Sequence, residues 1–307
     1  MKLKQIIFCL LLALFSLKSS AEINIKFMIN DQIVTNIDII NEKNYLIFLR
    51  PELKKVSDDD LLKIAENSLI RETIKKRELD IIFKNLDNLM FVDEIKKNLF
   101  KFKNVNNESD FKILLKKDNV EYKKVLERIK YEALWSEYIY KKYNSLLRID
   151  QKNLKKKLRV KISNNRKFEY NLSEILFEID GKSSRENKFK EIIAYINNNS
   201  FKTAASKFSV SNSSNKGGEI GWVKETVLSD ELNKILKKMQ INEISKPIRH
   251  PNGFLLIKIN NKRELKQNLN FDEELKDLIN FEKSKQLNQY SLMHYKKLKQ
   301  NSKINEY

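Results

Sequence analysis

The residue types that most often do chemistry are scarce in this sequence. Among its 307 residues are two histidines, His250 and His294, and one cysteine, Cys9, and the three lie far apart along the chain. Metal sites and acid–base pairs need such groups at close, characteristic spacings, and neither histidine has a partner at such a spacing. We therefore expect no metal site and no cofactor, and we expect surface or capping roles for both histidines.

Two other features could suggest a ligand. Gly181-Lys182-Ser183 resembles the end of a phosphate-binding loop, but Leu176, inside a predicted strand, stands where that motif needs its first glycine. Trp135 and Trp222 are most simply aromatic residues of the core or of its rim, with stacking on a ligand as the less favoured alternative. A nucleotide site is not predicted.

Residues 1–21 have the pattern of a signal peptide. Two lysines precede a short apolar core, Ile6–Phe15, and Ser19-Ser20-Ala21 supplies the small residues of a cleavage site. The core is too short to span a bilayer, which takes about 20 residues. Cys9 lies inside it, so the cleaved chain would contain no disulfide. We expect an exported, periplasmic protein without stable membrane insertion.

The charge of the chain is strongly basic, with 60 Lys and Arg against 41 Asp and Glu and a net charge of +19. Such a balance can indicate nucleic acid or an anionic membrane as partner. Here the lysines alternate with acidic residues along nearly every predicted helix, which is typical of solvated helix faces. We expect no nucleic-acid partner. The alternative hypothesis of a nucleic-acid-binding protein is suggested by the charge alone.

Apolar residues at helical spacing predict that most of the chain is helical. A strand pair over 23–34, with a turn at Asn30-Asp31, opens the chain. The predicted helices run from the Thr35 cap to Leu49, from the Ser57 cap past Ile74, and over 86–102, 109–117, 121–147 and 271–298. Between them, 150–165 is polar and is predicted to hold a helix end and a hinge.

The middle of the chain differs in its glycine and proline content. All five Gly lie between Gly181 and Gly253, and two of the three Pro lie at Pro247 and Pro251. Glycine is needed where the backbone turns tightly or another chain segment approaches closely. We therefore expect one compact unit of mixed strands and helices in this region.

The order of elements in that unit resembles the parvulin-type peptidyl-prolyl isomerase domain, over 168–262. The resemblance rests on an opening strand at 170–176, a small helix at 201–208, the Gly217-Gly218-x-x-Gly221 turn, a helix at 230–239 and a closing strand from Gly253. With the signal peptide, the helical segment and the last helix, the whole chain resembles a SurA-type periplasmic chaperone with a single parvulin domain. Met28–Ile39 resembles the start of the N-terminal module of that family.

The resemblance implies an α+β fold, with a mostly helical N-terminal chaperone module that a C-terminal helix completes. A parvulin-like domain, a small antiparallel sheet flanked by helices, is inserted into it. The expected boundaries are 1–21 for the signal peptide, 22–158 for the helical module, 168–262 for the inserted domain and 263–307 for the returning helix. The alternative is a generic helical bundle that merely begins with a hairpin.

Isomerisation of an X–Pro bond must overcome a barrier of about 18–20 kcal/mol, and it needs neither a metal nor a covalent step. The parvulin family assigns this work to two His, a Cys or Asp beside them, and an apolar pocket. The resemblance places Glu174 and Leu255 at the His positions and Ser211 at the Cys/Asp position. Leu255 forms no side-chain hydrogen bond, and Glu174 would need a Lys or Ser211 as partner.

The resemblance further places the peptide or proline pocket at Ile220, Leu228, Leu232, Asn252 and Phe254. These positions remain largely apolar, which suits an extended peptide. We expect a degenerate active site that holds peptide, in an ATP-independent chaperone for unfolded polypeptides, in particular outer-membrane β-barrel precursors. The alternative is an active prolyl isomerase of the parvulin class that tolerates these replacements.

Overall fold

The structure is a computed structural model that describes residues 22–83, 92–162, 167–179, 184–265 and 270–307. The predicted signal peptide, including Cys9, and the Gly181-Lys182-Ser183 motif lie outside these ranges. The elements are β1 (Ile25–Ile29), β2 (Gln32–Thr35), α2 (Asn36–Leu49), η1 (Pro51–Lys55), α3 (Asp58–Ile82), α4 (Val92–Phe102), α5 (Glu108–Lys117), α6 (Tyr122–Tyr143), η2 (Asn144–Leu146), α7 (Gln151–Ile162), β3 (Phe168–Phe177), α8 (Arg185–Asn198), α9 (Phe201–Phe208), η3 (Asn212–Lys216), β4 (Glu219–Lys224), α10 (Asp230–Lys238), β5 (Ile248–His250), β6 (Gly253–Glu264), α11 (Phe271–Gln300) and β7 (Ile304–Glu306).

The first helices begin where the sequence predicts caps. The Thr35 hydroxyl accepts from the backbone of Asp38, whose carboxylate accepts from the Thr35 backbone at 2.9 Å, so the two form a capping box at the start of α2. Ser57 caps α3 in the simpler way. Asn30 adopts φ 54° in the tight turn between β1 and β2, a conformation that Asn tolerates better than most residues.

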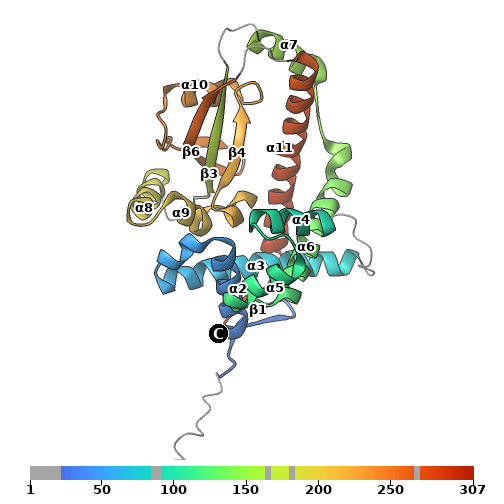
Figure 1. The fold of residues 1–307 in the computed structure, drawn as a ribbon, viewed down its shortest axis with the longest axis vertical. Coiled ribbons are helices and arrows are strands. Elements are labelled where there is room, and N and C mark those ends of the chain that lie inside the picture. Colours follow the sequence, from blue (N-terminus) through green and yellow to red (C-terminus); the bar gives the residue numbers. More distant parts are fainter. Residues whose placement is uncertain (1–21, 84–91, 163–166, 180–183, 266–269) are drawn as a thin grey trace, which may run out of the picture.

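The two ends of the chain together form what we call the helical module, α2 to α6 with α11 and a small sheet. The sheet has the strand order β2-β1-β7, and both pairings are antiparallel. Figure 1 shows the carboxyl end of the chain beside β1. The strand β7 is not predicted from the sequence, because three residues carry too short a pattern to reveal a partner that lies at the other end of the chain.

The segment 168–264, which we call the sheet domain, has the strand order β4-β3-β6-β5 with every pair antiparallel. One face of this sheet, with Ile175 and Leu256, packs against α8 and α9. The opposite face, with Tyr170 and Ile257, packs against α10 and also against α7 and α11. The predicted α+β fold class is therefore confirmed.

The polar segment after residue 150 forms the helix α7 instead of a hinge over its described part. Leu154, Leu158 and Ile162 recur every four residues, and Leu158 is fully buried against the sheet domain and α11. The polar composition of the segment gave no sign of this apolar face, because three apolar residues suffice for one face of a helix that otherwise carries Lys and Arg.

Helix α11 connects the two parts of the molecule (Figure 1). Its first half buries Leu275 and Leu278 against the sheet domain, and its second half brings Leu287, Tyr290 and Tyr295 to α3 and α6. His294 lies in this second half with 6% of its surface exposed. The expected surface or capping role of His294 is therefore wrong, because the helix that carries it returns into the core.

Several charged groups of the helical module hold the sheet domain. Arg50 Nη1 donates to the Ser206 hydroxyl and, at 3.1 Å, to the carbonyl of Ser214. Arg71 Nη1 donates to the Ser214 hydroxyl at 2.8 Å, and Lys207 pairs with Asp60 at 2.6 Å. Burial lowers the pKa of Arg50 to about 10, so the guanidinium stays charged at neutral pH.

None of the helices in the described ranges is both long and apolar enough to cross a membrane. Those ranges also hold no group of three or more His, Cys, Asp or Glu side chains placed to bind a metal ion.

Candidate functional site

The polar part of the predicted site is a carboxylate held by serines. Glu174 is half-buried in β3, and its Oε1 accepts from the Ser211 hydroxyl at 2.6 Å and from the Ser213 hydroxyl at 2.9 Å. The Ser213 hydroxyl also lies 3.1 Å from the Ser211 hydroxyl. Of the partners expected for Glu174, the structure thus provides Ser211, and Ser213 is one that sequence reasoning missed.

A glycine turn places the serine segment against β3. Gly218 has φ +80°, and its carbonyl accepts from the Glu174 backbone N–H at 2.8 Å. A Cβ atom at Gly218 would lie 2.3 Å from the Glu174 carbonyl oxygen. Only glycine allows this close approach, which explains why the motif recognised in the sequence carries glycine there.

The apolar part of the site lies on the α10 face of the sheet. Leu255 pairs with Leu176 on β3 and with Ile248 on β5, and it packs half-buried on the cluster that contains Leu228. Leu232, on α10, packs on the same cluster. Leu255, Leu228 and Leu232 are thus brought together, and their side chains provide apolar contact but no hydrogen bond.

Leu228 is covered by other parts of the chain. It has 4% of its surface exposed, and its carbonyl accepts from Lys161 Nζ of α7 at 2.5 Å. A pocket of about 340 Å³ lies beside it, between the segment 227–230 and helices α7 and α11, with Leu154 and Leu278 among its lining residues. The residue expected to contact a proline ring therefore faces a crevice shared with two helices outside the sheet domain.

Three other predicted positions lie apart from this group. Phe254 packs against Phe177, with ring centroids 5.9 Å apart, on the α8/α9 face of the sheet. Successive residues of a strand point to opposite faces, so Phe254 and Leu255 cannot share one pocket. Ile220 is 41% exposed at a bulge in β4. Asn252 lies in the β5–β6 turn.

A histidine that sequence reasoning set aside lies on the same face of the sheet as the carboxylate. His250 Nδ1 accepts from the Asn252 backbone at 3.2 Å, which is the expected capping contact. Burial lowers the pKa of His250, while the negative charge of Glu174 opposes this effect and Lys285 and Lys296 of α11 add to it. Knowledge that Ile248 pairs with Leu255 would have revealed this placement. His250 lies two residues after Ile248 in the same strand, so its side chain points to the face of the sheet that carries Leu255.

The comparisons with known proteins agree with this geometry. The rotamase family, described as the PPIC-type PPIASE domain, matches residues 175–261. Chaperone SurA of Pseudomonas putida is 42% identical over 65 residues, which are 21% of this chain and 15% of that protein. Chaperone SurA of Pseudomonas aeruginosa is 22% identical over 165 residues, 50% of this chain and 39% of that protein. Residues 175–261 thus form a PPIC-type domain, and the chain is similar to SurA chaperones.

The chain spans less than two fifths of the length of the curated SurA proteins that it matches. A solved SurA-like chaperone of Campylobacter jejuni is 15% identical, with 92% of this chain and 98% of that chain covered and a TM-score of 0.38.

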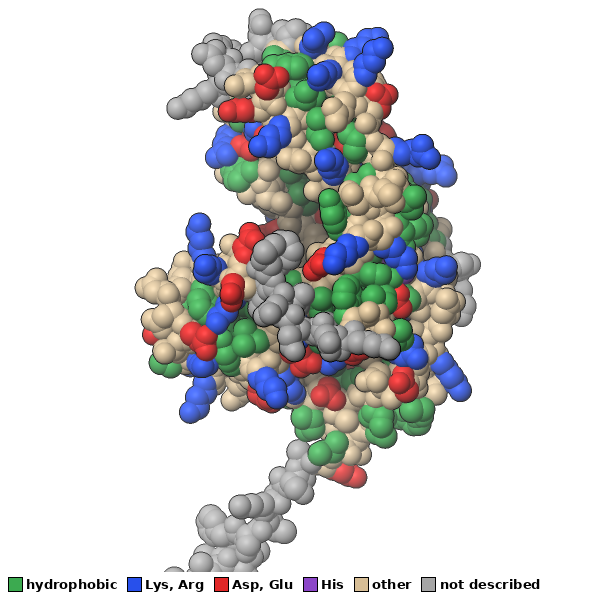
Figure 2. All heavy atoms as spheres, turned by 90° about the vertical axis from the view of Figure 1, so that its right-hand side faces the viewer, with side chains coloured by type: hydrophobic (Ala, Val, Ile, Leu, Met, Phe, Trp, Pro, Cys, Tyr) green, Lys and Arg blue, Asp and Glu red, His purple; other side chains and the backbone are tan. Residues whose placement is uncertain are grey.

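The charges of the chain are mixed over the face in Figure 2. Lys and Arg side chains are scattered there among acidic and apolar ones, and they do not gather into one basic area. Ion pairs between the parts of the chain, such as Lys224 with Glu274 at 2.7 Å, neutralise some of the basic side chains. On this face the basic side chains therefore form no continuous patch.

Proposed function

We propose that the chain is an ATP-independent chaperone that binds unfolded polypeptides, and that its parvulin-like domain holds peptide without isomerising it efficiently. The observation that carries this proposal is the centre of the site. Where the family has imidazoles, this chain has Leu255, which forms no side-chain hydrogen bond, and Glu174, whose carboxylate already has two serine donors. Such a centre offers a twisted prolyl amide few free donors.

The crevice beside Leu228 supports binding of an extended chain. Its apolar residues, Leu154, Leu228 and Leu278, come from three different elements, so a client segment there would contact α7, the sheet domain and α11 together. We propose outer-membrane β-barrel precursors as clients, because before barrel closure they expose alternating apolar side chains and unpaired strand edges. The pattern of residues 1–21 supports export to the periplasm, where such clients occur.

The proposed domain boundaries are those expected from the sequence, 22–158, 168–262 and 263–307. The burial of Leu158 of α7 and of Leu278 of α11 against the sheet domain supports a design in which helices on both sides of the insert enclose it. Leu287 and Tyr290 of α11 pack instead on the helical module. The apolar face of α11 is thus divided between the two parts of the molecule.

Two assays on the mature chain test the proposal. The first uses NMR exchange to measure prolyl isomerisation of a short peptide, and the second measures how far the chain suppresses the aggregation of an unfolded β-barrel protein. We expect suppression without detectable turnover. Leu232→Ala should weaken suppression, because Leu232 contributes to the apolar group around Leu255. The matched control is Ile81→Ala, on the exposed side of α3, which should leave suppression unchanged. Turnover that Leu232→Ala abolishes would refute the proposal in favour of an enzyme.

A second candidate function is an active prolyl isomerase, and the placement of His250 favours it. The imidazole of His250 lies on the same face of the sheet as Glu174, through the pairing of β5 with β6 and of β6 with β3. If this pair does the chemistry, His250→Gln should abolish turnover and leave peptide affinity unchanged. A nucleic-acid-binding protein, the rival suggested by charge, would retain DNA on the mature chain in a salt-dependent manner.

A further inference from the structure

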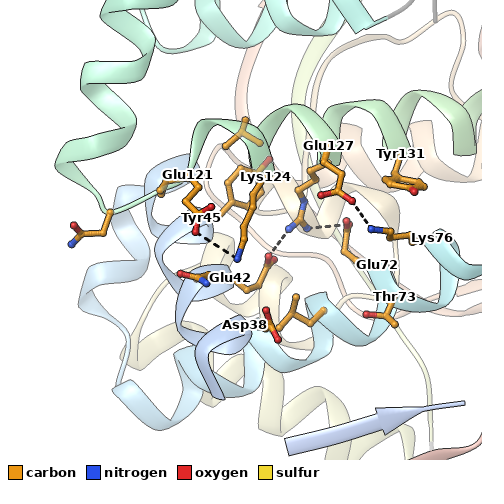
Figure 3. Close-up of a pocket in the computed structure, with 16 residues that line it drawn as sticks. Asp38, Glu42, Tyr45, Glu72, Thr73, Lys76, Glu121, Lys124, Glu127 and Tyr131 are labelled. Carbon is orange, nitrogen blue, oxygen red and sulfur yellow. Dashed lines mark hydrogen bonds and ion pairs between the residues drawn. The ribbon is translucent and has the colours of Figure 1, made fainter. Parts of the chain in front are cut away.

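The helical module has a pocket of its own, and the residues that line it are far in sequence from those at the centre of the sheet domain. It lies between α2, α3 and α6, around Glu42 and Arg128, and has a volume of about 270 Å³. Figure 3 shows the side chains of Glu42 and Glu72 on one side of it, facing Lys124 and Glu127 of α6 on the other. We call it the Glu42 pocket.

The Glu42 pocket has a surplus of negative charge. Five carboxylates line it, those of Asp38, Glu42, Glu72, Glu121 and Glu127, against three cationic side chains, those of Lys76, Lys124 and Arg128. The difference of five and three leaves two negative charges unmatched, in a chain whose net charge is +19. A local excess opposite in sign to the rest of the molecule favours a cationic ligand.

One guanidinium is shared by two of these carboxylates. The Arg128 guanidinium lies 2.5 Å from Glu42 Oε2 and 3.0 Å from Glu72 Oε1, and it stacks on Tyr45 with 4.5 Å between the guanidinium carbon and the ring centroid. Burial alone would lower the pKa of Arg128, but the carboxylates, Glu42 first, raise it well above its ordinary value. Arg128 thus pairs with Glu42 and Glu72, and its single positive charge does not match their two negative charges.

One carboxylate oxygen in the pocket lacks a donor. Glu42 has 5% of its surface exposed, and within the described residues its Oε1 has no hydrogen-bond partner. A buried acceptor without a donor is unfavourable, and more so when it is charged. This oxygen and the surplus charge point independently to a ligand that brings both a donor and a positive charge.

We propose that the Glu42 pocket binds the cationic side chain of a Lys or Arg residue of an extended polypeptide. The ammonium or guanidinium donates to Glu42 Oε1, and the aliphatic stem lies against the apolar lining residues Leu69, Val125 and Tyr131. The inference rests on the proposed function, because that function supplies the polypeptide. It adds a preference for basic residues to the apolar contacts of the sheet domain.

The test is calorimetric binding of a short unfolded apolar peptide with one variable central residue. Lys is compared with norleucine and Arg with citrulline, because each pair has nearly the same shape and differs in charge. We expect the Lys and Arg peptides to bind about tenfold tighter than their neutral counterparts, the effect of one charge-assisted hydrogen bond. Equal affinities within each pair would overturn the proposal.

Two variants assign the preference to this pocket. Glu42→Gln should reduce the ratio of the Lys and norleucine affinities to about one. Because Glu42 also pairs with Arg128, a second variant, Lys124→Gln, is measured that leaves this pair intact. Lys124→Gln should increase the preference for the Lys peptide over the norleucine peptide about two- to fivefold, since it removes a competing positive charge. Lys116→Gln, on the exposed surface of α5, is the matched control. A preference that Lys124→Gln leaves unchanged would contradict the assignment.

Competition separates a client side chain from a soluble cation. Free arginine should compete with the Lys peptide far more weakly than an unlabelled copy of that peptide, and equal competition would overturn the polypeptide part of the proposal. If the norleucine peptide binds as well as the Lys peptide, the pocket inference fails while the proposed chaperone function stands. If no peptide binds at all, the proposed function itself fails.

Discussion

The junction of α6 with α11 and the centre of the sheet domain around Leu255 differ in their buried polar groups. At the junction of α6 with α11, His294 Nε2 lies 3.2 Å from Glu78 Oε1 and its Nδ1 lies 2.8 Å from the Tyr143 hydroxyl. Next to it, Trp135 Nε1 donates to the Ser291 hydroxyl at 2.8 Å. At the corresponding centre of the sheet domain stands Leu255, packed on leucine and isoleucine.

This difference indicates what each centre is for. A fully satisfied polar network in a core fixes the orientation of the helices that contribute to it, since any other arrangement leaves its groups unpaired. The apolar centre around Leu255 carries no such directional constraint. The junction of α6 with α11 thus favours one assembly of its helices, whereas the Leu255 centre does not impose one.

The comparison can be followed experimentally because each region holds one tryptophan. Trp135 is buried in the helical module and Trp222 lies on β4 of the sheet domain. Variants that keep only one of them, with Phe at the other position, report the urea unfolding of each region separately.

The largest effect is expected from Gly218→Ala, which should destabilise the sheet domain by more than about 3 kcal/mol, because positive φ and a contact of backbone with Cβ add up. The Trp222 transition should shift to lower urea and the Trp135 transition should follow only slightly. Gly221→Ala is the matched control, since Gly221 has φ +88° but no described atom within 4 Å of the place that a Cβ would take. It should cost about 1–2 kcal/mol. Equal losses would show that the close approach to Glu174 is unimportant.

Shortening a buried side chain in the first or in the second half of α11 should affect mainly the region that this half contacts. Leu278→Ala and Leu292→Ala each remove a buried leucine and should each cost about 2–4 kcal/mol. Leu278→Ala should lower the Trp222 transition more, and Leu292→Ala the Trp135 transition. Identical shifts of both probes in both variants would mean that the regions unfold as one unit and that the contrast between them is not energetic.

The contact between the regions should weaken when Arg50 is replaced. Arg50→Met removes the hydrogen bonds to Ser206 and Ser214, and the expected cost is about 1.5–3 kcal/mol, the range for bonds to a charged group. The two tryptophan transitions should separate further. Lys296→Met, which removes an exposed pair with Glu178, is the control and should cost less than about 1 kcal/mol. A larger loss from Lys296→Met than from Arg50→Met would contradict this account of the interface.

The smallest effect concerns pH. Burial lowers the pKa of His294, Lys142 lowers it further, and Glu78 opposes them. The folded state therefore binds the proton less readily than the unfolded state, whose His pKa is about 6.5. The contribution of His294 to the stability of the fold is complete above the pKa of the unfolded state. This contribution is lost as the pH falls through that pKa toward the lower pKa of the folded state.

Urea midpoints of the Trp135 transition measured from about pH 7.5 to 5.5 should fall with decreasing pH, and the slope should be shallower in His294→Gln. The pKa of His250 is also lowered by burial, so His250→Gln should flatten the slope of the Trp222 transition instead. A slope at Trp135 that His294→Gln leaves unchanged would assign the pH dependence to other groups.

Much of the fold could be predicted because its signals are local. Thr35 and Ser57 mark helix starts through hydrogen bonds within four residues, and the glycines of the turn at 217–221 mark backbone conformations that other residues adopt at a cost. The partner of Glu174 was also within reach, since Ser211 was placed by the same resemblance. Ser213 follows two residues later but carries no pattern of its own.

The positions that sequence reasoning misplaced depend on which faces meet. Phe254 and Leu255 are neighbours in one strand and so point to opposite faces, but only the packing of helices on the two faces decides which cluster each side chain joins. His294 was expected at the surface because a single histidine on a helix gives no sign of the helices that will cover it.

The sequence by itself determined most of the helices, their caps and the glycine turn, because these follow from interactions within a few residues and from the periodicity of apolar side chains. The parvulin-like unit followed from the resemblance that the order of its elements carries. Only the tertiary structure decided that α7 and α11 cover Leu228, that Arg50 holds the serine segment and that Glu42 lies in a pocket with surplus negative charge. Those features arise where segments distant in the chain exclude water together, and burial of that kind is a property of the assembled molecule.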